Sequence, residues 1–332
     1  MIRRRSVGHD RVAGLALAVA ATGALAELNL RRDRRRRLAL GDCLYVENRG
    51  RGAPVVFLPG LQGSTRYWRR AFDDLAAGRR LLFVDLLGFG RSPWPAAGYT
   101  LDDQLAALRR TLVAVGATRQ VTLVGHSTGA VLAAYYAARH PAEVSRLVLL
   151  GTPVFDNPRE ARRRLWKLGP LAGIFSQSRP LAWAACTLLC ALRPLLVRTL
   201  PGLGRELPAA VVRDATLHVW PAVDGTIRHL LLGSPISAAL AQLAAHGGLG
   251  GPGSAGAPGA PDGMAHGPWP PAPDPGIVFV HGVADPITPL ARIRRLAAAT
   301  GAAVAAAPGG HLSYVTVARE ITRAAILGSH PG

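Results

Sequence analysis

The segment from Val121 to Tyr136 places a Gly-x-Ser-x-Gly pattern between two apolar runs. The first run ends at residues 125–129, Gly-His-Ser-Thr-Gly, and the second resumes directly afterwards. Glycines two positions on either side of a serine suit a sharp turn from strand to helix, because any Cβ there would crowd the backbone. The pattern therefore predicts a turn that exposes the Ser127 hydroxyl to a ligand. A surface turn that happens to hold serine between glycines is the alternative, so the surroundings must decide.

Strand and helix patterns alternate on both sides of this turn. Apolar runs typical of buried parallel strands are followed by loops rich in glycine. This alternation predicts an α/β fold with a doubly wound, mostly parallel sheet that binds ligands at the carboxyl ends of its strands. The strand patterns lie at residues 37–40, 43–47, 54–58, 80–85, 121–124, 146–153, from 277 onward and at 303–307.

Helical patterns occupy the stretches between these strands. We expect helices at 68–75, from 99 onward, at 290–300 and at 313–327. Thr100 and Asp103 are spaced as a capping box at the start of the second helix. The residues expected on its buried side recur at helical spacing. They are Leu101, Leu105, Leu108, Leu112 and Val113.

Composition divides the chain of 332 residues into five parts. An apolar and basic tail at 1–36 precedes the first part of the core at 37–153. The strand signal then disappears, and 154–246 is expected to form an inserted helical lid. Residues 247–276 are dominated by Gly, Pro and Ala, which predicts a flexible linker. The core resumes at 277–332.

The net charge of +19 comes almost entirely from arginine, with Lys167 the only lysine. Residues 1–37 hold ten arginines against three acidic residues, so +7 of the excess lies in this tail. The body of the protein is less basic than the total suggests. No RNA-binding signature, zinc finger or basic helix with interleaved aromatic residues is present, so we expect no nucleic-acid partner.

The tail has three interpretations. Arg3 to Arg5 precede an apolar run at 12–26 that resembles a signal peptide, but the arginine block at 31–37 opposes translocation of the chain beyond it. The run is also shorter than the roughly 20 residues that span a bilayer. We favour a helix in peripheral contact with an anionic membrane surface, which predicts a cytoplasmic protein, free or bound to the cytoplasmic face, rather than a secreted one. A helix packed on the protein itself is an equal alternative.

The three cysteines predict neither a disulfide framework nor a metal site. Cys186 and Cys190 lie four residues apart in an expected helix, and Cys43 stands alone. Buried thiols are the expected state. No Cys/His spacing resembles a zinc site, so we expect no metal and no cofactor.

Ser127 is followed by an acid and a histidine, each just past an expected strand. A serine hydroxyl attacks a carbonyl only when a histidine takes its proton and an acid orients that imidazole. Asp285 follows Ser127 by 158 residues, and His311 follows Asp285 by another 26. With these motifs, the chain resembles the α/β-hydrolase fold superfamily over about residues 37–327, apart from the linker.

Four motifs carry this resemblance. Residues 125–129 match the nucleophile elbow, 281–286 resemble the turn that bears the acid, and 309–311 resemble the histidine loop. Residues 85–92 are similar to the family's Asp-x-x-Gly-x-Gly-x-Ser turn. The resemblance implies a Ser127, His311, Asp285 triad.

The oxyanion hole departs from the commonest family pattern, since Pro59-Gly60 stands where relatives often carry His-Gly. The resemblance implies backbone N–H donors from Leu61 and Thr128. Such donors do not depend on the identity of the neighbouring side chain.

Several other residues are candidates with weaker support. Asp156 is an alternative position for the acid, and His281 is expected to be structural. Gln62, His126 and Trp220 are candidate pocket residues, as is His218, although core or turn roles serve each equally well.

The sequence therefore predicts a serine hydrolase of a small lipophilic carboxylic ester. Serine at the elbow argues against haloalkane dehalogenases and epoxide hydrolases, whose nucleophile is an aspartate. Thioesters, amides, lactones and carbon–carbon bonds remain alternative substrates of the same triad, and a silent binding protein of the same fold is the alternative from another class. The oligomeric state is not predicted.

Overall fold

A seven-stranded sheet forms the centre of the computed structural model, which describes residues 6–37, 41–68, 70–168, 170–199, 209–249 and 276–328. The strand order is β1-β3-β2-β4-β5-β6-β7. Only β1 runs antiparallel to its neighbour, and every other pair is parallel. The strands are β1 Val46–Arg49, β2 Ala53–Leu58, β3 Arg79–Val84, β4 Val121–His126, β5 Val144–Leu150, β6 Ile277–Gly282 and β7 Ala303–Ala307. This topology confirms the predicted doubly wound sheet.

Side chains of the central strands alternate between two apolar layers, one on each face of the sheet. In β2, Val56 and Leu58 enter one layer while Val55 and Phe57 enter the other. Both sets are fully buried, which explains the continuous apolar runs in the sequence. The sheet therefore holds its carboxyl-end loops on a rigid base.

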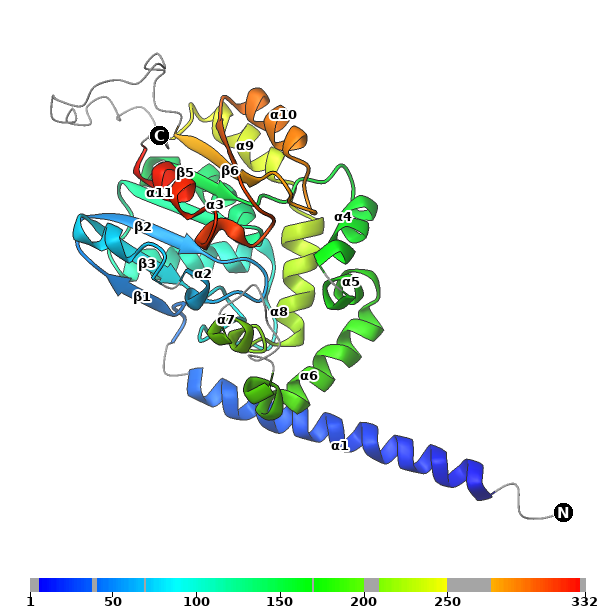
Figure 1. Ribbon diagram of the computed structural model, residues 1–332. Helices are drawn as coiled ribbons and strands as arrows, with labels where there is room; N and C mark the ends of the chain where they lie inside the picture. The colour runs from blue at the N-terminus through cyan, green and yellow to red at the C-terminus, as the bar shows by residue number, and fades with distance from the viewer. Residues whose placement is uncertain are drawn as a thin grey trace, which may run out of the picture.

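Helices cover both faces of the sheet (Figure 1). One layer packs under α2, α3, α9 and α10, and the other packs under α11 and the 3-10 turns η2 and η3. Their bounds are α2 Leu101–Ala114, α3 Thr128–Arg139, α9 Ile236–Ala245, α10 Leu290–Thr300, α11 Arg319–Leu327, η2 Thr65–Trp68 and η3 Asp73–Ala77; a further 3-10 turn, η4, spans Pro141–Glu143.

The start of α2 has the predicted capping box. The Thr100 hydroxyl accepts from the Asp103 N–H, and the Asp103 carboxylate accepts from the Thr100 N–H. Leu105, Leu108 and Leu112 are buried as expected. Val113 is 53% exposed, so the prediction that it lies on the buried side of the helix is wrong. It lies one position past Leu112, which rotates it about 100° away from the core.

Several element boundaries differ from the sequence expectation; β5, expected at 146–153, ends at Leu150. The strand expected at 43–47 begins only at Val46, and the helix expected at 68–75 is a pair of 3-10 turns. The closing helix is split into a 3-10 turn η8, Ser313–Val315, and α11. The break at residues 316–318 lies a few positions past His311. The strand expected at 37–40 lies outside the described residues, except for Arg37, which ends a helix.

The helical insertion lies between β5 and β6. It holds a π-helix, labelled η7, directly after α8. Most of the predicted linker, at 250–275, lies outside the described residues. The helices are α4 Pro158–Leu165, η5 Trp166–Leu168, α5 Pro170–Gln177, α6 Arg179–Thr199, α7 Ala209–Asp214, α8 Trp220–Gly225 and η7 Thr226–Leu232, followed by α9.

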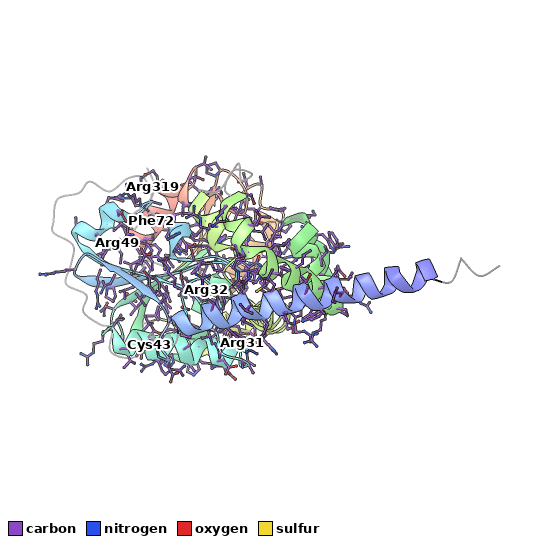
Figure 2. The ribbon with its side chains drawn as sticks, turned by 90° about the horizontal axis from the view of Figure 1, so that it is seen from below. Arg31, Arg32, Cys43, Arg49, Phe72 and Arg319 are labelled. Carbon is purple, nitrogen blue, oxygen red and sulfur yellow. The ribbon has the colours of Figure 1, made fainter. Side chains whose placement is uncertain are left out.

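The N-terminal helix α1, Ser6–Arg37, crosses the underside of the body and extends past it (Figures 1 and 2). Its second half packs on α6, where the Asn29 amide donates to the Cys190 carbonyl at 3.0 Å. Ala26 is buried in this contact, whereas Leu17 and Leu28 are exposed. Within the part of the chain that the structure describes, no helix combines the length and apolarity needed to cross a bilayer.

Candidate active site

The backbone at Ser127 has the strained geometry expected of the turn between β4 and α3. Its φ of 52° and ψ of −115° are uncommon for a residue with a side chain. A Cβ on Gly125 would collide with the carbonyl of Gly129, and one on Gly129 would collide with the carbonyl of Leu58. The glycines are therefore required by close backbone approach. The Ser127 N–H donates to the Leu150 carbonyl at 2.9 Å, which fixes the turn on β5.

Three side chains from three loops form one hydrogen-bonded chain at the carboxyl edge of the sheet. The Oγ of Ser127 lies 3.0 Å from the Nε2 of His311, whose Nδ1 lies 2.8 Å from the Oδ2 of Asp285. All three residues are buried. Ser127 follows β4, Asp285 follows β6 and His311 follows β7.

The carboxylate of Asp285 is held in its ionised form. Burial alone would raise its pKa, but the hydrogen bond and charge of His311 outweigh this effect and lower the pKa below the ordinary value. Its other oxygen accepts from the Ile287 N–H at 2.7 Å. An ionised carboxylate accepts hydrogen bonds only, so the Nδ1 of His311 carries a proton. Whenever this imidazole carries no second proton, the lone pair of its Nε2 faces Ser127.

Two further histidines pack around this chain. The ring of His126 stacks on Tyr67 at 4.9 Å, and its Nε2 donates to the His311 carbonyl at 2.7 Å. Burial, followed by the nearby His311, lowers the pKa of His126 to about 3, so this ring is neutral near pH 7. His281 donates from Nε2 to the Thr288 carbonyl at 2.7 Å. These contacts support the histidine loop and the acid turn.

Asp156 lies apart from the hydrogen-bonded chain. Its side chain is 70% exposed, and it pairs with Arg292 at 2.9 Å. The acid that contacts His311 is Asp285. The structure therefore favours Asp285 over Asp156 as the partner of the histidine.

The loop after β2 reaches over Ser127. A Cβ on Gly60 would lie 3.1 Å from the His126 ring and 3.2 Å from the Cβ of Ser127, so glycine permits this close approach. The Gly63 N–H donates to the Gly60 carbonyl at 2.9 Å and closes a tight turn that contains Leu61. Thr128 is the first residue of α3, so its N–H precedes the first turn of helical hydrogen bonds. Leu61 and Thr128 thus flank the serine.

The candidate pocket residues have different surroundings. Gln62 has a left-handed φ of 58°, and its side-chain nitrogen lies 3.4 Å from the His218 ring. Trp220 starts α8 and is half-buried against the core. His126 is buried beneath the turn. Of these residues, only Gln62 lies on the loop beside Ser127, and His218 contacts it from the helical insertion.

A small cavity of about 140 Å³ lies between α3, the loop after β5 and the π-helix. Val131, one helical turn past Ser127, forms part of its wall. Most of the lining side chains are apolar, and Asp156 is among the polar ones. Neither Ser127 nor His311 lines it.

Two contacts of the site escaped sequence analysis because they join distant segments. Ser64 donates to Asp214 at 2.7 Å across 150 positions. Tyr314 accepts from the Gly282 N–H at 3.1 Å and lies beside His126. No local pattern marks either residue.

Metal ligands and disulfides are absent from the described part of the chain. No cluster of three or more His, Cys, Asp or Glu side chains suited to a metal ion occurs among these residues. Cys43, Cys186 and Cys190 form no disulfide, and burial raises the pKa of Cys186 to about 12.

The sheet, the strained serine turn and the hydrogen-bonded serine, histidine and aspartate together define an α/β-hydrolase architecture. The family model described as "alpha/beta hydrolase fold" matches residues 53–180. This match and the architecture confirm the α/β-hydrolase fold that the sequence motifs predicted.

Individual relatives match shorter segments. A probable lysophospholipase, BODYGUARD 1 of Arabidopsis thaliana, is 34% identical over 111 residues, which cover 32% of this chain and 24% of that protein. A haloalkane dehalogenase of Agrobacterium fabrum is 39% identical over 119 residues, covering 36% of this chain and 38% of the relative. The chain spans about a quarter to a third of the length of three such curated relatives.

Solved structures share the fold over most of the chain. An esterase from Exiguobacterium antarcticum has a TM-score of 0.58 at 18% identity, covering 86% of this chain and 94% of the esterase. A bromoperoxidase from Bacillus anthracis has a TM-score of 0.59 at 20% identity, covering 86% and 94%. At such identities, the likeness concerns the fold.

Proposed function

We propose that this protein is a serine hydrolase that cleaves a lipophilic carboxylic ester through an acyl-enzyme on Ser127. The observation that carries the proposal is the continuous hydrogen-bond chain from the Oγ of Ser127 through His311 to Asp285. The direction of these hydrogen bonds suits the attack. Asp285 accepts from the Nδ1 of His311, which leaves Nε2 to accept the proton of the Ser127 hydroxyl.

The reaction proceeds in two halves. His311 accepts the hydroxyl proton as the Oγ of Ser127 attacks the acyl carbon, and Asp285 stabilises the imidazolium that forms. The tetrahedral intermediate collapses when His311 gives the proton to the leaving alcohol. Water then attacks the acyl-enzyme with His311 as the base, which releases the acid and restores Ser127.

The backbone N–H groups of Leu61 and Thr128 are proposed to bind the oxyanion. Both flank the serine, and the close approach of Gly60 keeps the first beside it. One such donor contributes on the order of 3 kcal/mol to the stability of the transition state.

Support for a lipophilic acyl group comes from the apolar side chains between α3 and the π-helix, such as Val131 and Leu230. The helical insertion packs against the same apolar layer as α3, and we propose that it serves as a lid. Relatives named as a lysophospholipase and a lipase, the latter from a Moraxella strain and 36% identical over 121 residues, support an ester substrate.

Turnover of a panel of esters, thioesters and amides with the same acyl chains tests the proposal. We expect hydrolysis of p-nitrophenyl esters from acetate to octanoate, with kcat/KM rising as the acyl chain lengthens, and no turnover by Ser127→Ala. A protein that folds and hydrolyses thioesters or amides faster than esters would change the substrate class. A folded protein with no turnover on the whole panel would favour a binding role.

We also propose that residues 1–37 bind peripherally to an anionic membrane surface. Support comes from the exposed Leu17 and Leu28 of α1 and from the arginine-rich block that ends the helix. Vesicles of phosphatidylcholine with and without phosphatidylglycerol test this. The protein should cosediment with anionic vesicles, and Leu17→Glu with Leu28→Glu should release it. Equal sedimentation of this double variant and the wild type would contradict the proposal.

A further inference from the structure

We propose that the helical insertion positions the oxyanion loop, through Asp214 acting on Ser64 and His218 acting on Gln62. Both contacts lie on the C-terminal side of the Leu61 N–H, one and three residues after it. The inference rests on the proposed hydrolase function. It assigns Asp214 and His218 as positioning residues. They lie about 90 positions after Ser127 and about 150 to 160 positions after the loop.

The first contact is a buried hydrogen bond to a carboxylate. The Ser64 hydroxyl donates to the Oδ2 of Asp214 at 2.7 Å, and Arg66 approaches the other oxygen at 3.3 Å. Ser64 is fully buried, and Asp214 is 4% exposed. A hydrogen bond to a charged acceptor in such surroundings is stronger than a neutral one. It joins the end of α7 to the loop after β2.

The second contact fixes a strained residue. Gln62 has a left-handed φ of 58°, which a residue with a side chain seldom adopts. The Gln62 amide nitrogen lies 3.4 Å from both ring nitrogens of His218. The Nδ1 of His218 donates to the Ala215 carbonyl at 2.9 Å, so Nε2 is the nitrogen left to accept from Gln62. Burial and the charge of Arg193 lower the pKa of His218 to about 4, which keeps this acceptor neutral near pH 7.

The segment that supplies both partners is itself anchored. The Gly90 N–H donates to the Leu217 carbonyl at 2.9 Å, and Arg193 donates to the His218 carbonyl at 2.8 Å. These bonds attach residues 214–218 to the turn after β3 and to α6. The insertion therefore presents a fixed surface to the loop.

The loop is also fixed at its far end, because the Thr65 N–H donates to the buried carboxylate of Asp85. Between Gly60 and Thr65, the side chains that hold the loop from outside are Gln62 and Ser64. Releasing them lets the Leu61 N–H rotate relative to that of Thr128. Because the oxyanion exists only in the transition state, the loss falls on kcat rather than on KM.

A matched pair of glycine substitutions separates this role from backbone strain. Gln62 and Gln120 are both glutamines with a left-handed φ, of 58° and 54°, but Gln120 is exposed and lies before β4. Gln62→Gly keeps the backbone permitted and removes the contact with His218. We expect it to lower kcat at least fivefold with KM within twofold, whereas Gln120→Gly leaves both unchanged.

The second arm tests the buried bond. We expect Ser64→Ala and Asp214→Ala each to lower kcat tenfold or more, the double variant to fall no further than either, and Asp214→Asn, which keeps an acceptor oxygen, to recover most of the loss. Circular dichroism and a fluorophosphonate probe at Ser127 verify that each variant is folded and retains its nucleophile.

Three outcomes would overturn the inference. They are wild-type kcat in folded Gln62→Gly and Ser64→Ala, a rise in KM with kcat unchanged, and multiplicative losses in the double variant. If Ser64→Ala and Asp214→Ala fail to fold, the Gln62 and Gln120 pair decides alone. A folded wild type with neither turnover nor labelling would instead refute the proposed function, and the positioning role with it.

Discussion

The Nε2 of His311 lies 3.0 Å from the Oγ of Ser127, although 184 positions separate the two residues in the sequence. The contact forms because β4 and β7 run in the same direction in one sheet, so their carboxyl ends lie at the same edge. Both partners are buried, so the hydroxyl has few competing hydrogen bonds from water.

Removing either partner should abolish turnover without unfolding the protein. We expect Ser127→Ala and His311→Gln to lower kcat by about 10⁴-fold or more, because members of a triad act as a unit. Steady-state kinetics on a p-nitrophenyl ester measures the loss. Ser145→Ala, which alters an exposed serine at the start of β5, is the matched control and should retain full activity.

The acid can be identified by comparing two asparagine substitutions. Asp285→Asn should lower kcat about 10⁴-fold, because the imidazole loses the acceptor that holds its tautomer. Asp156→Asn should leave kcat within twofold, since Asp156 is an exposed partner of Arg292. Equal losses, or a larger loss in Asp156→Asn, would show that the acid has been misassigned.

The elbow glycines should tolerate no side chain. Gly129→Ala would drive a Cβ into the Leu58 carbonyl, and we expect a loss of stability of about 3 kcal/mol or more, or no soluble protein. Gly78→Ala is the control, because its φ of −137° suits alanine and no atom lies within 4 Å of the added Cβ. Thermal unfolding compares the two. Similar midpoints would mean that the turn is looser than the structure has it.

Buried His126 should make the fold sensitive to mild acid. Its folded pKa of about 3 lies below the unfolded value of about 6.5, so between these pH values only the unfolded chain binds the proton. Stability is therefore lost as pH falls below about 6.5. Between pH 7.5 and 5, the wild type should lose about 2 kcal/mol more than His126→Gln, whose amide keeps the donor to the His311 carbonyl.

Urea unfolding at the two pH values measures this difference. Groups that titrate in both proteins cancel in the comparison, including Asp85, whose pKa burial raises to about 6. A wild type and variant with equal pH dependence would show that His126 is protonated in the fold, or solvated.

The sheet and the serine turn could be predicted because their signals are local. A buried strand requires an apolar run, and the elbow requires Gly125 and Gly129 wherever it occurs. The capping box at Thr100 is equally local, since both partners lie within four residues. Such features follow from short stretches of chain.

The contacts around the oxyanion loop could not be predicted in this way. Ser64 and Asp214 are ordinary polar residues in sequence, and only the folded insertion brings them together. The left-handed backbone of Gln62 also has no signal in the sequence, because glutamine has no preference for this conformation. The packing of α1 on α6 depends on Asn29 reaching a backbone carbonyl, for which side-chain patterns give no signal.

Reaction with a fluorophosphonate probe tests the central proposal most directly, because an activated serine displaces fluoride from the probe and becomes phosphonylated. Peptide mapping by mass spectrometry should find one adduct, on Ser127, that forms much more slowly in His311→Gln and at the wild-type rate in Ser145→Ala. No adduct should form in Ser127→Ala. Absence of labelling in the folded wild type, or labelling that persists in folded Ser127→Ala, would contradict the assignment of Ser127 as the nucleophile.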